Sequence, residues 1–289
     1  MRGFRDQALA VAFLLCFGVE IPAYASDTLF DDFEDKQLST IWSQSRLLRD
    51  QVWMDKKVVR KGRQSLAIKI DARNFDPKCE CQRNELREAD AVQLNFGSDI
   101  WYRFSIKIEK DTQEIPESRW LLAAWKQDGD GSPFLALRYD RGIFYITMES
   151  NATRVLLASS LIDVRMIFDL LQLKTDGGTQ KYNFISDPEL YRGKTALTMD
   201  YGLNPYLPDP SVEWVDMLIR VKGDLSGNGI VEISANNNLI VMVNGVIGTD
   251  NFSDNKQYLR IGQNRDPIPL ETILYLDDFR RGDSRSEVE

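Results

Sequence analysis

The chain has 289 residues, with 44 acidic and 36 basic side chains, a formal net charge of −8 and no histidine. The negative charge argues against a nucleic-acid partner. The missing histidine removes the commonest general base and the commonest metal ligand from every mechanism.

The N-terminus is predicted to be a secretory signal peptide, residues 1–25. Two arginines precede an apolar run at residues 8–19, and the small-x-small sequence AYA ends at Ala25. The run is shorter than the ~20 apolar residues that span a bilayer, and no later run approaches that length. We therefore expect a secreted or periplasmic protein with no membrane partner, in which residues 26–289 form a single, monomeric domain.

Short strand-like segments bounded by Gly, Asn, Asp or Pro follow one another through this domain. They lie at residues 27–42, 64–70, 100–108, 119–126, 134–139, 143–148, 214–222, 229–234, 239–245, 257–262 and 272–284. Their spacing indicates an all-β, antiparallel architecture, and the first and last segments are expected to pair at one sheet edge.

Turn sequences refine this pattern in the second half of the chain. SGNG at residues 226–229 and ANNN at residues 235–238 predict a three-stranded meander between residues 214 and 243. A short helix is expected near residues 161–171. The loop at residues 201–210, rich in Pro and Tyr, is expected to frame a binding groove.

The stretch CECQRNELREAD, residues 79–90, concentrates charge in a few positions. Read as a strand, it places Cys79, Cys81, Arg83, Glu85 and Arg87 on one face. The arginines then bind carboxylate or sulfate groups, with Glu85 holding their guanidinium planes. A solvated row of ion pairs and a helix are the alternatives.

The two cysteines of this stretch remain after signal cleavage, in an oxidising compartment. On a regular strand Cys79 and Cys81 lie about 6.6 Å apart, since each residue rises ~3.3 Å. That distance is near the upper limit for a disulfide, so both a bridge and two free thiols stay open.

Hydrolase signatures are missing from the sequence. Paired carboxylates in the strand patterns E-x-D-x-E or E-x-D-x-x-E are absent, as are G-x-S-x-G and H-E-x-x-H. Elimination from a uronic acid remains open, and it needs a cation at the C6 carboxylate, a base for the C5 proton and an acid for the leaving oxygen. Without histidine the base must be tyrosine or lysine, whose pKa neighbouring arginines lower.

The residues resemble the jelly-roll polysaccharide lyases, chiefly the heparin-lyase-like family, with a fainter similarity to jelly-roll alginate lyases. The resemblance rests on GRQSLAIKI, QRNELRE, WYRFSIKI, LLAAWKQ, GNGIVEISANNNLIVMVNG, YLRIGQNRD and LYLDDFRRGD, in that order. It implies a concanavalin-like β-jelly-roll sandwich of two antiparallel sheets with a concave groove for an acidic polysaccharide. Its R-x-E-L-R element implies that Arg83, Glu85 and Arg87 lie in that groove.

Three reactive groups of these families are replaced in this chain. Ala124 and Lys126 stand where the families carry Q-x-H, and Asn264 stands where Y-x-K-x-G-x-Y carries its second tyrosine. Lys126 is then either a base or another carboxylate-binding cation. The chain is accordingly either a polysaccharide lyase acting on a uronic-acid-containing glycan or a glycan-binding relative without catalysis.

We predict a site of three catalytic residues, Lys126, Tyr258 and Arg83. Substrate is expected to contact Arg87, Glu85, Arg138, Tyr145, Arg260, Asn264 and Trp120. No cofactor is required for this chemistry. Relatives of this architecture bind calcium in some cases, and oxygen ligands are available at residues 128–131 and at Asp31, Asp32, Asp277 and Asp278.

Overall fold

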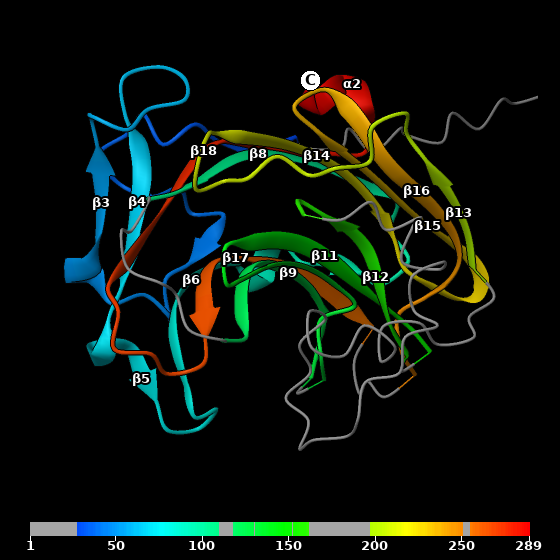
Figure 1. Cartoon of the computed structure of the whole chain (residues 1–289), viewed down its shortest axis with the longest axis horizontal. Coiled ribbons are helices and arrows are strands. Elements are labelled where there is room, and N and C mark those ends of the chain that lie inside the picture. The colour runs from blue at the N-terminus through cyan, green and yellow to red at the C-terminus, as the bar shows by residue number, and fades with distance from the viewer. Residues whose placement is uncertain (1–27, 110–117, 130, 152, 162–196, 251–254) are drawn as a thin grey trace, which may run out of the picture.

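The computed structural model describes residues 28–109, 118–129, 131–151, 153–161, 197–250 and 255–289. These residues form two antiparallel sheets of nine strands each, one stacked on the other (Figure 1). The predicted signal peptide and, apart from Leu161, the predicted helix at residues 161–171 lie outside the described residues. The all-β, two-sheet prediction is confirmed.

We call the sheet that arches across the top of Figure 1 the outer sheet. Its strands follow the order β13 (Leu197–Tyr201), β16 (Asn238–Ile247), β15 (Asp224–Ala235), β14 (Val215–Lys222), β8 (Ile100–Ile108), β18 (Thr272–Gly282), β4 (Ser65–Ile70) and β3 (Val52–Asp55), with β1 (Leu29–Asp31) on β18.

The second sheet, here the groove sheet, lies beneath it. Its strands follow the order β12 (Thr153–Ser159), β11 (Ile143–Ser150), β10 (Leu135–Asp140), β9 (Trp120–Gln127), β17 (Lys256–Arg265), β6 (Cys81–Glu88) and β2 (Trp42–Ser43). β5 (Phe75–Asp76) pairs with β6, and β7 (Leu94–Asn95) pairs with β17.

The core lies between the two sheets and follows the strand period of two. On β14, Val215, Met217, Ile219 and Val221 are buried and alternate with half-buried residues. Strands of the groove sheet add Leu259 and the other inward side chains of β9, β10, β11 and β17 to the same cluster. The alternation fixes which side chains face away from the core, and therefore which residues can line a groove.

The predicted meander is confirmed, because β14 pairs with β15 and β15 with β16. Asn236 and Asn237 both have positive φ, 48° and 64°, as a two-residue hairpin turn requires. The SGNG sequence is not a separate turn, however. It forms an irregular stretch inside β15, where pairing with β16 skips from Asp224 to Gly229.

The chain ends pair as expected, but not at a sheet edge. β1 runs antiparallel to β18, with Phe30 opposite Arg280. β18 itself lies between β8 and β4 in the interior of the outer sheet. The edge position was wrong because sequence order does not reveal which later strand closes a sheet.

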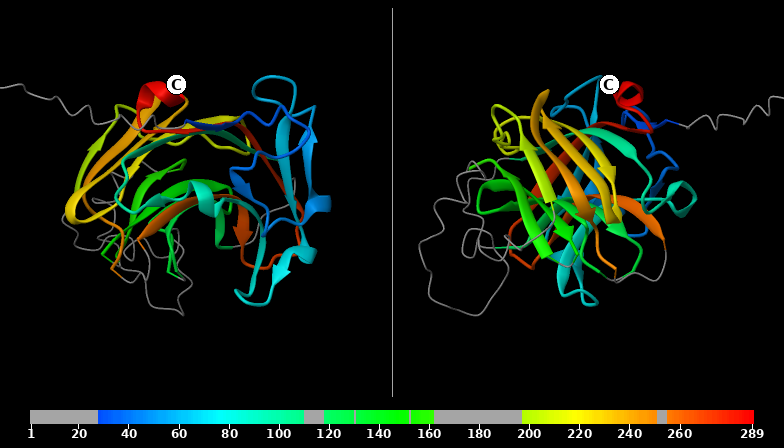
Figure 2. Two further views of the ribbon diagram at one scale, coloured as in Figure 1. Left: turned by 180° about the vertical axis from the view of Figure 1, so that it is seen from behind. Right: turned by 90° about the vertical axis from the view of Figure 1, so that its right-hand side faces the viewer.

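The helical segments are short. They comprise the 3₁₀ turns η1 (Arg49–Gln51), η2 (Ala72–Asn74) and η3 (Asp90–Val92) and the C-terminal helix α2 (Arg285–Val288). α2 packs against β18 and β8 of the outer sheet (Figure 2). Within the described residues no helix is long and apolar enough to cross a membrane.

Candidate active site

The groove sheet carries a pocket of about 300 Å³ on the face that points away from the core. Seven cationic side chains and a single carboxylate, Glu85, are among the described residues that line it. The cations are Arg46, Arg83, Arg119, Lys126, Arg138, Arg154 and Arg260. A chain with a net charge of −8 therefore concentrates positive charge at one place, as an anionic ligand requires.

Most of the charged stretch at residues 79–90 forms strand β6 of this site. Arg83 and Arg87 are half-buried and point to the groove side together with Glu85, whereas Leu86 lies in the core and Glu88 is buried on the same inward side. The two-face prediction is confirmed for residues 81–88, and the helical alternative is wrong because pairing with β17 and β2 fixes the segment as a strand.

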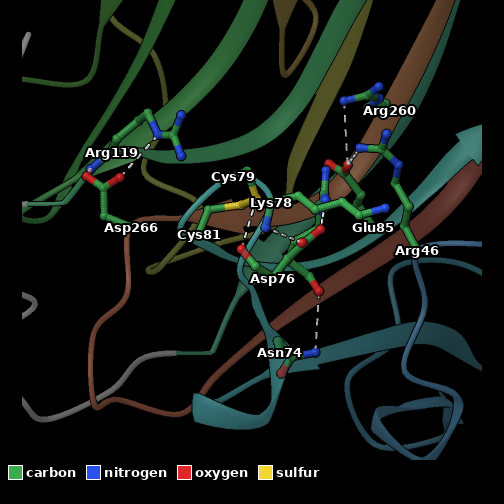
Figure 3. Close-up of a disulfide and its surroundings, with 11 residues drawn as sticks. Arg46, Asn74, Asp76, Lys78, Cys79, Cys81, Glu85, Arg119, Arg260 and Asp266 are labelled. Atoms are coloured by element: carbon green, nitrogen blue, oxygen red, sulfur yellow. Dashed lines mark hydrogen bonds and ion pairs between the residues drawn. A yellow bond between two sulfur atoms is a disulfide. The ribbon is translucent and has the colours of Figure 1, made fainter. Parts of the chain in front are cut away.

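Glu85 holds two arginines in the pocket. Its Oε1 accepts a hydrogen bond from Arg46 Nη1 at 3.1 Å and lies 3.8 Å from Arg260 Nη1 (Figure 3). The Glu85 side chain is 5% exposed, so these charge-assisted contacts are little screened by water. Glu85 thus orients the cations on either side of it.

Gly262 makes the close approach of β17 to β6 possible. A Cβ at this position would meet the Cα of Glu85 at 2.6 Å and the carbonyl oxygen of Asn84 at 2.7 Å. Its φ is +140°, a conformation that side-chain-bearing residues rarely adopt. The glycine of YLRIGQN therefore brings the Arg260 and Asn264 strand against Glu85.

Arg83 lines the pocket and makes an ion pair with Asp76 of β5. Burial lowers the pKa of the Arg83 guanidinium, and the charge of Arg46 lowers it further. Both effects come from a site that crowds cations and excludes water. An anion bound here relieves that repulsion.

Cys79 and Cys81 form a disulfide, so the bridged alternative is correct (Figure 3). Their Cα atoms are 5.2 Å apart, closer than a regular strand allows, because β6 begins only at Cys81 and Glu80 has a φ of 50°. Cys79 also lines the pocket.

Lys126 enters the pocket from β9 and is 8% exposed. Its Nζ donates to the carbonyl oxygen of Gly129 at 3.3 Å. Ala124, two residues earlier, lines the pocket as well, whereas Trp125 between them is buried in the core. The expectation that Lys126 and Ala124 share the groove face is confirmed, and the small alanine leaves space beside the amine.

Tyr258 lies directly across from Lys126 in the pairing of β17 with β9. It is 2% exposed and is not among the residues that line the pocket. Its hydroxyl accepts a hydrogen bond from Arg260 Nη2 at 2.7 Å, and the guanidinium of Arg87 lies 4.4 Å from the ring centre. In this arrangement Tyr258 supports the two arginines rather than presenting its hydroxyl to the pocket.

Asn264 and Arg83 are directly opposite each other in the β17–β6 pair, and both line the pocket. The Asn264 Oδ1 is buried without a hydrogen-bond partner in the described residues. The Oδ1 can only accept, so it is the Nδ2 of Asn264, beside the Arg83 guanidinium, that can donate to a carboxylate ligand.

Arg138 and Tyr145 come from β10 and β11, where they are opposite each other. Arg138 is 4% exposed, lines the pocket and donates from Nε to Thr147 Oγ1 at 2.8 Å. Tyr145 alternates with the core residues Phe144 and Ile146, which places it on the groove side, but it is buried and does not line the pocket.

Trp120 was wrongly predicted to contact substrate. It is 0% exposed and packs in the core, edge-on to Tyr139 at 5.4 Å between ring centres. The guanidinium carbon of Arg265 lies over the Trp120 ring, 5.6 Å from its centre. A register shift between β9 and β17 changes which residues of β9 face the groove, so that Leu121 lines the pocket in its place.

Three lining cations, Arg46, Arg119 and Arg154, were not predicted. Arg119 pairs with Asp266 at 3.3 Å, and Arg154 with Glu149 at 2.7 Å. Arg154 lies on β12, directly after the predicted strand segment at residues 143–148. Extending the period-two alternation into that next strand could have predicted that Arg154 faces the groove. Arg46 lies in an irregular segment after β2, and no sequence signal indicates its direction.

The acidic groups considered for calcium already bind groups of the protein. Asp31 accepts from the backbone of Phe33 and from Trp42 Nε1, Asp277 accepts from two backbone N–H groups, and Asp278 pairs with Lys61. Across the described ranges no three potential ligands gather into a metal site. Calcium binding stays a prediction, and Asp130 of the group at residues 128–131 lies outside the described residues.

Solved structures with a similar fold include an endo-β-1,4-glucuronan lyase from the fungus Trichoderma reesei, at 13% identity and a TM-score of 0.51 over 92% of this chain and 94% of that one. The cellulose induced protein Cip1 gives the same identity and TM-score over 89% and 97%. A family 7 alginate lyase, A1-II′, is 12% identical, with a TM-score of 0.48 over 80% of this chain and 81% of its own. The first two confirm the predicted jelly-roll sandwich.

The sequence itself was also compared with known proteins and families. No curated protein matches it. The family model described as polysaccharide lyase matches residues 31–280, which run from the last residue of β1 to most of β18 and include every strand between them. The heparin-lyase-like branch stays a prediction. The chain belongs to the polysaccharide lyase family.

Proposed function

We propose that this protein is an exported lyase that cleaves a uronic-acid-containing polysaccharide by β-elimination. The observation that carries the proposal is the convergence of Arg83, Asn264 and Lys126 in one cationic pocket. A neutral glycan has no use for such a pocket, whereas a polymer with a carboxylate on its sugar rings matches it. The glucuronan lyase of similar fold, which by its name acts on an acidic polymer, supports the same substrate class.

The reaction breaks two bonds and forms one double bond. A base takes the C5 proton, the electron pair becomes the C4–C5 double bond, and the C4–O4 bond breaks with a proton delivered to the leaving oxygen. Negative charge develops on the carboxylate as the C5 proton leaves. Fixed cations beside that carboxylate stabilise the charge, because they are already oriented and little solvated.

We assign the carboxylate to Arg83 and Asn264, which are opposite each other on neighbouring strands. Arg260, held by Glu85 and Tyr258, extends the positive surface from the same strand as Asn264. Lys126 is assigned the C5 proton, because a neutral amine is a stronger base than Glu85, the lining carboxylate that Arg46 and Arg260 already engage. The protonated lysine then supplies a proton for the leaving oxygen.

The test is the ultraviolet absorbance of unsaturated uronyl ends, with purified mature protein and glucuronan, alginate, heparin, heparan or pectate. We expect product from one of these polymers, and loss of at least about 10²-fold in kcat for Lys126→Ala. Lys222→Ala on the outer sheet is the matched control and leaves kcat unchanged. Lys126→Arg preserves the positive charge but not the base, so it separates the two roles of the lysine.

Loss of the usual histidine, glutamine and tyrosine favours a second candidate, a glycan-binding protein without catalysis. It is supported by Ala124 and Asn264, which stand at positions where the related families carry reactive groups. Silence on all five polymers, together with binding that Arg83→Ala weakens, selects this candidate over the lyase.

A further inference from the structure

A second pocket lies on the flank of the sandwich, outside the groove. Its volume is about 390 Å³, and it has no lining residue in common with the groove pocket. The segment at residues 36–49 forms one wall, and edge strand β3 with Leu66 of β4 forms the other. The pocket therefore opens where the two sheets are joined at their edges.

Two cations at this pocket are available for a ligand. Lys36 and Arg49 are both exposed, and neither makes an ion pair or a side-chain hydrogen bond within the described residues. Gln37 and Gln44 add amide groups, and none of the described residues that line the pocket is acidic. Most other arginines of the molecule are paired with carboxylates, so this local excess of positive charge suits an anionic ligand.

An aromatic side chain completes the set. Trp53 is 36% exposed and lines the pocket, and its Nε1 donates to Asp55 Oδ2 at 3.1 Å, which fixes the indole ring. The side chains of Leu38, Leu47 and Met54 form apolar wall around it. An indole face with cations and amides around it fits a sugar ring that carries a carboxylate, because the ring has apolar C–H faces and polar edges.

The flank pocket and the groove lie on two sides of one short segment. Arg46 lines the groove pocket, whereas Leu47 and Arg49, which follow it, line the flank pocket. A polymer that leaves the groove past Arg46 therefore reaches the flank pocket. Two linked contacts raise overall affinity because the second binding event becomes intramolecular.

We propose that the flank pocket is an accessory binding site for a second stretch of acidic polysaccharide, held by Lys36 and Arg49 with a sugar ring against Trp53. The ligand class rests on the proposed function, but the site does not take part in the elimination. Its role is to retain long chains, which short fragments cannot exploit.

The experiment measures dissociation constants of the mature protein by calorimetry, with long chains and with tetrasaccharides of glucuronan, alginate and pectate as probes. The pocket variant is Lys36→Gln with Arg49→Gln. The control is Lys56→Gln with Lys57→Gln, which removes the same charge from exposed positions that line neither pocket. Trp53→Ala tests the pocket without any change of charge.

We expect the pocket variant and Trp53→Ala to weaken binding of a long chain about tenfold and to leave tetrasaccharide binding unchanged. The control variant changes neither. Equal losses in the pocket and control variants overturn the proposal, since they indicate a diffuse charge effect. Unchanged long-chain binding in both pocket variants overturns it too, as does an equal loss of tetrasaccharide binding.

All binding measurements are made in proteins that also carry Lys126→Ala, so that the long chains are not cleaved during the titration. Long-chain binding that needs Trp53 without any unsaturated product supports the accessory site and rejects the lyase proposal. If product forms but long-chain binding is the same in the pocket variant, in Trp53→Ala and in the control variant, the accessory site alone is rejected.

Discussion

The outward faces of the two sheets are built on different principles. On the outer sheet, charged strand residues are partly exposed and pair with residues of adjoining loops. Arg220 makes two hydrogen bonds to Asp99, at 2.8 and 2.7 Å, and Arg60 makes two to Asp216, at 2.9 and 2.7 Å. Such pairs contribute little to stability, since water solvates them nearly as well.

On strands β10 and β11 of the groove sheet, the outward face is buried too. Every residue of β10 and β11 is buried, including Arg138, Thr147 and Glu149 on the face away from the core. Burying a cation costs several kcal/mol unless partners compensate for lost water. The ion pairs of the outer sheet are thus solvated by water, whereas the groove sheet holds partly desolvated charges in fixed positions. Recognition of an anion requires the second arrangement.

The largest effect is expected where the two sheets are joined. Glu88 of β6 accepts from Arg281 Nη1 of β18 at 2.7 Å and from the backbone N–H of Leu259 at 2.8 Å. Glu88→Gln leaves the buried Arg281 charge without its partner, so we expect a loss of about 3 kcal/mol in the free energy of unfolding. Urea denaturation measures it.

Glu271→Gln is the matched control for this change, because Glu271 pairs with Lys69 at 3.1 Å and its side chain is 56% exposed. We expect less than about 0.5 kcal/mol from it. Similar losses at Glu88 and Glu271 would contradict the view that burial, and not the number of ion pairs, decides the contribution.

A smaller expected effect, on activity, compares one arginine from each face. Arg83→Ala removes a cation from the pocket, and we expect kcat/KM to fall about 100-fold, since charge that develops on the substrate loses its partner. Arg220→Ala removes an equally well-paired cation from the outer sheet and should leave kcat/KM unchanged. Initial rates on the cleaved polymer give both values, and thermal unfolding shows that each variant is folded.

An equal fall in both variants would mean that the whole-molecule field, rather than the pocket, attracts the substrate. Raising the salt concentration separates the two explanations. A long-range effect disappears beyond a screening length of about 8 Å at physiological ionic strength, whereas a contact inside the pocket persists.

Much of the fold could be predicted because long strands carry their own pattern. The alternation in residues 214–222 and the paired asparagines at 236 and 237 determined the meander without any distant information. The short strands β2, β5 and β7 have two residues each and no pattern of their own. They exist because a neighbouring strand offers free hydrogen-bonding groups, and a local sequence does not show this.

The site was predictable to the same extent. Arg83 and Glu85 follow from strand alternation on β6, and Lys126 and Ala124 from that on β9. Arg87 shares the face of Arg83 but does not line the pocket. Trp120 failed because the register of β9 against β17 shifts between Ile261 and Asn264, and a shift of this kind reverses which side chains face the groove. Arg46 was not predicted because its segment is irregular and shows no periodic alternation of apolar and polar residues.

The next prediction concerns how the pocket cations are held. Tyr258→Phe removes the hydroxyl that accepts from Arg260, and it keeps the ring beneath Arg87. If Tyr258 positions Arg260, kcat/KM falls about tenfold, as for one lost hydrogen bond to a charged group, and the shape of the pH–rate profile stays the same. A loss beyond about 1,000-fold with a changed profile would instead make Tyr258 a proton-transfer residue.

The smallest effect is expected on the outer sheet and depends on pH. Burial opposes ionisation of Asp216, but hydrogen bonds from Arg60 and Ser105 outweigh it and hold the pKa of this carboxyl below its usual value of 3.8. A lowered pKa in the folded state means that Asp216 stabilises the protein above that value, and that this contribution is lost as the pH falls through the folded pKa. Because the Arg60 side chain is 42% exposed, the contribution stays below about 1 kcal/mol. Asp216→Asn should therefore lower the unfolding temperature slightly at pH 7 and converge with the unmodified protein in strong acid, and a difference that grows as the pH falls would contradict this assignment.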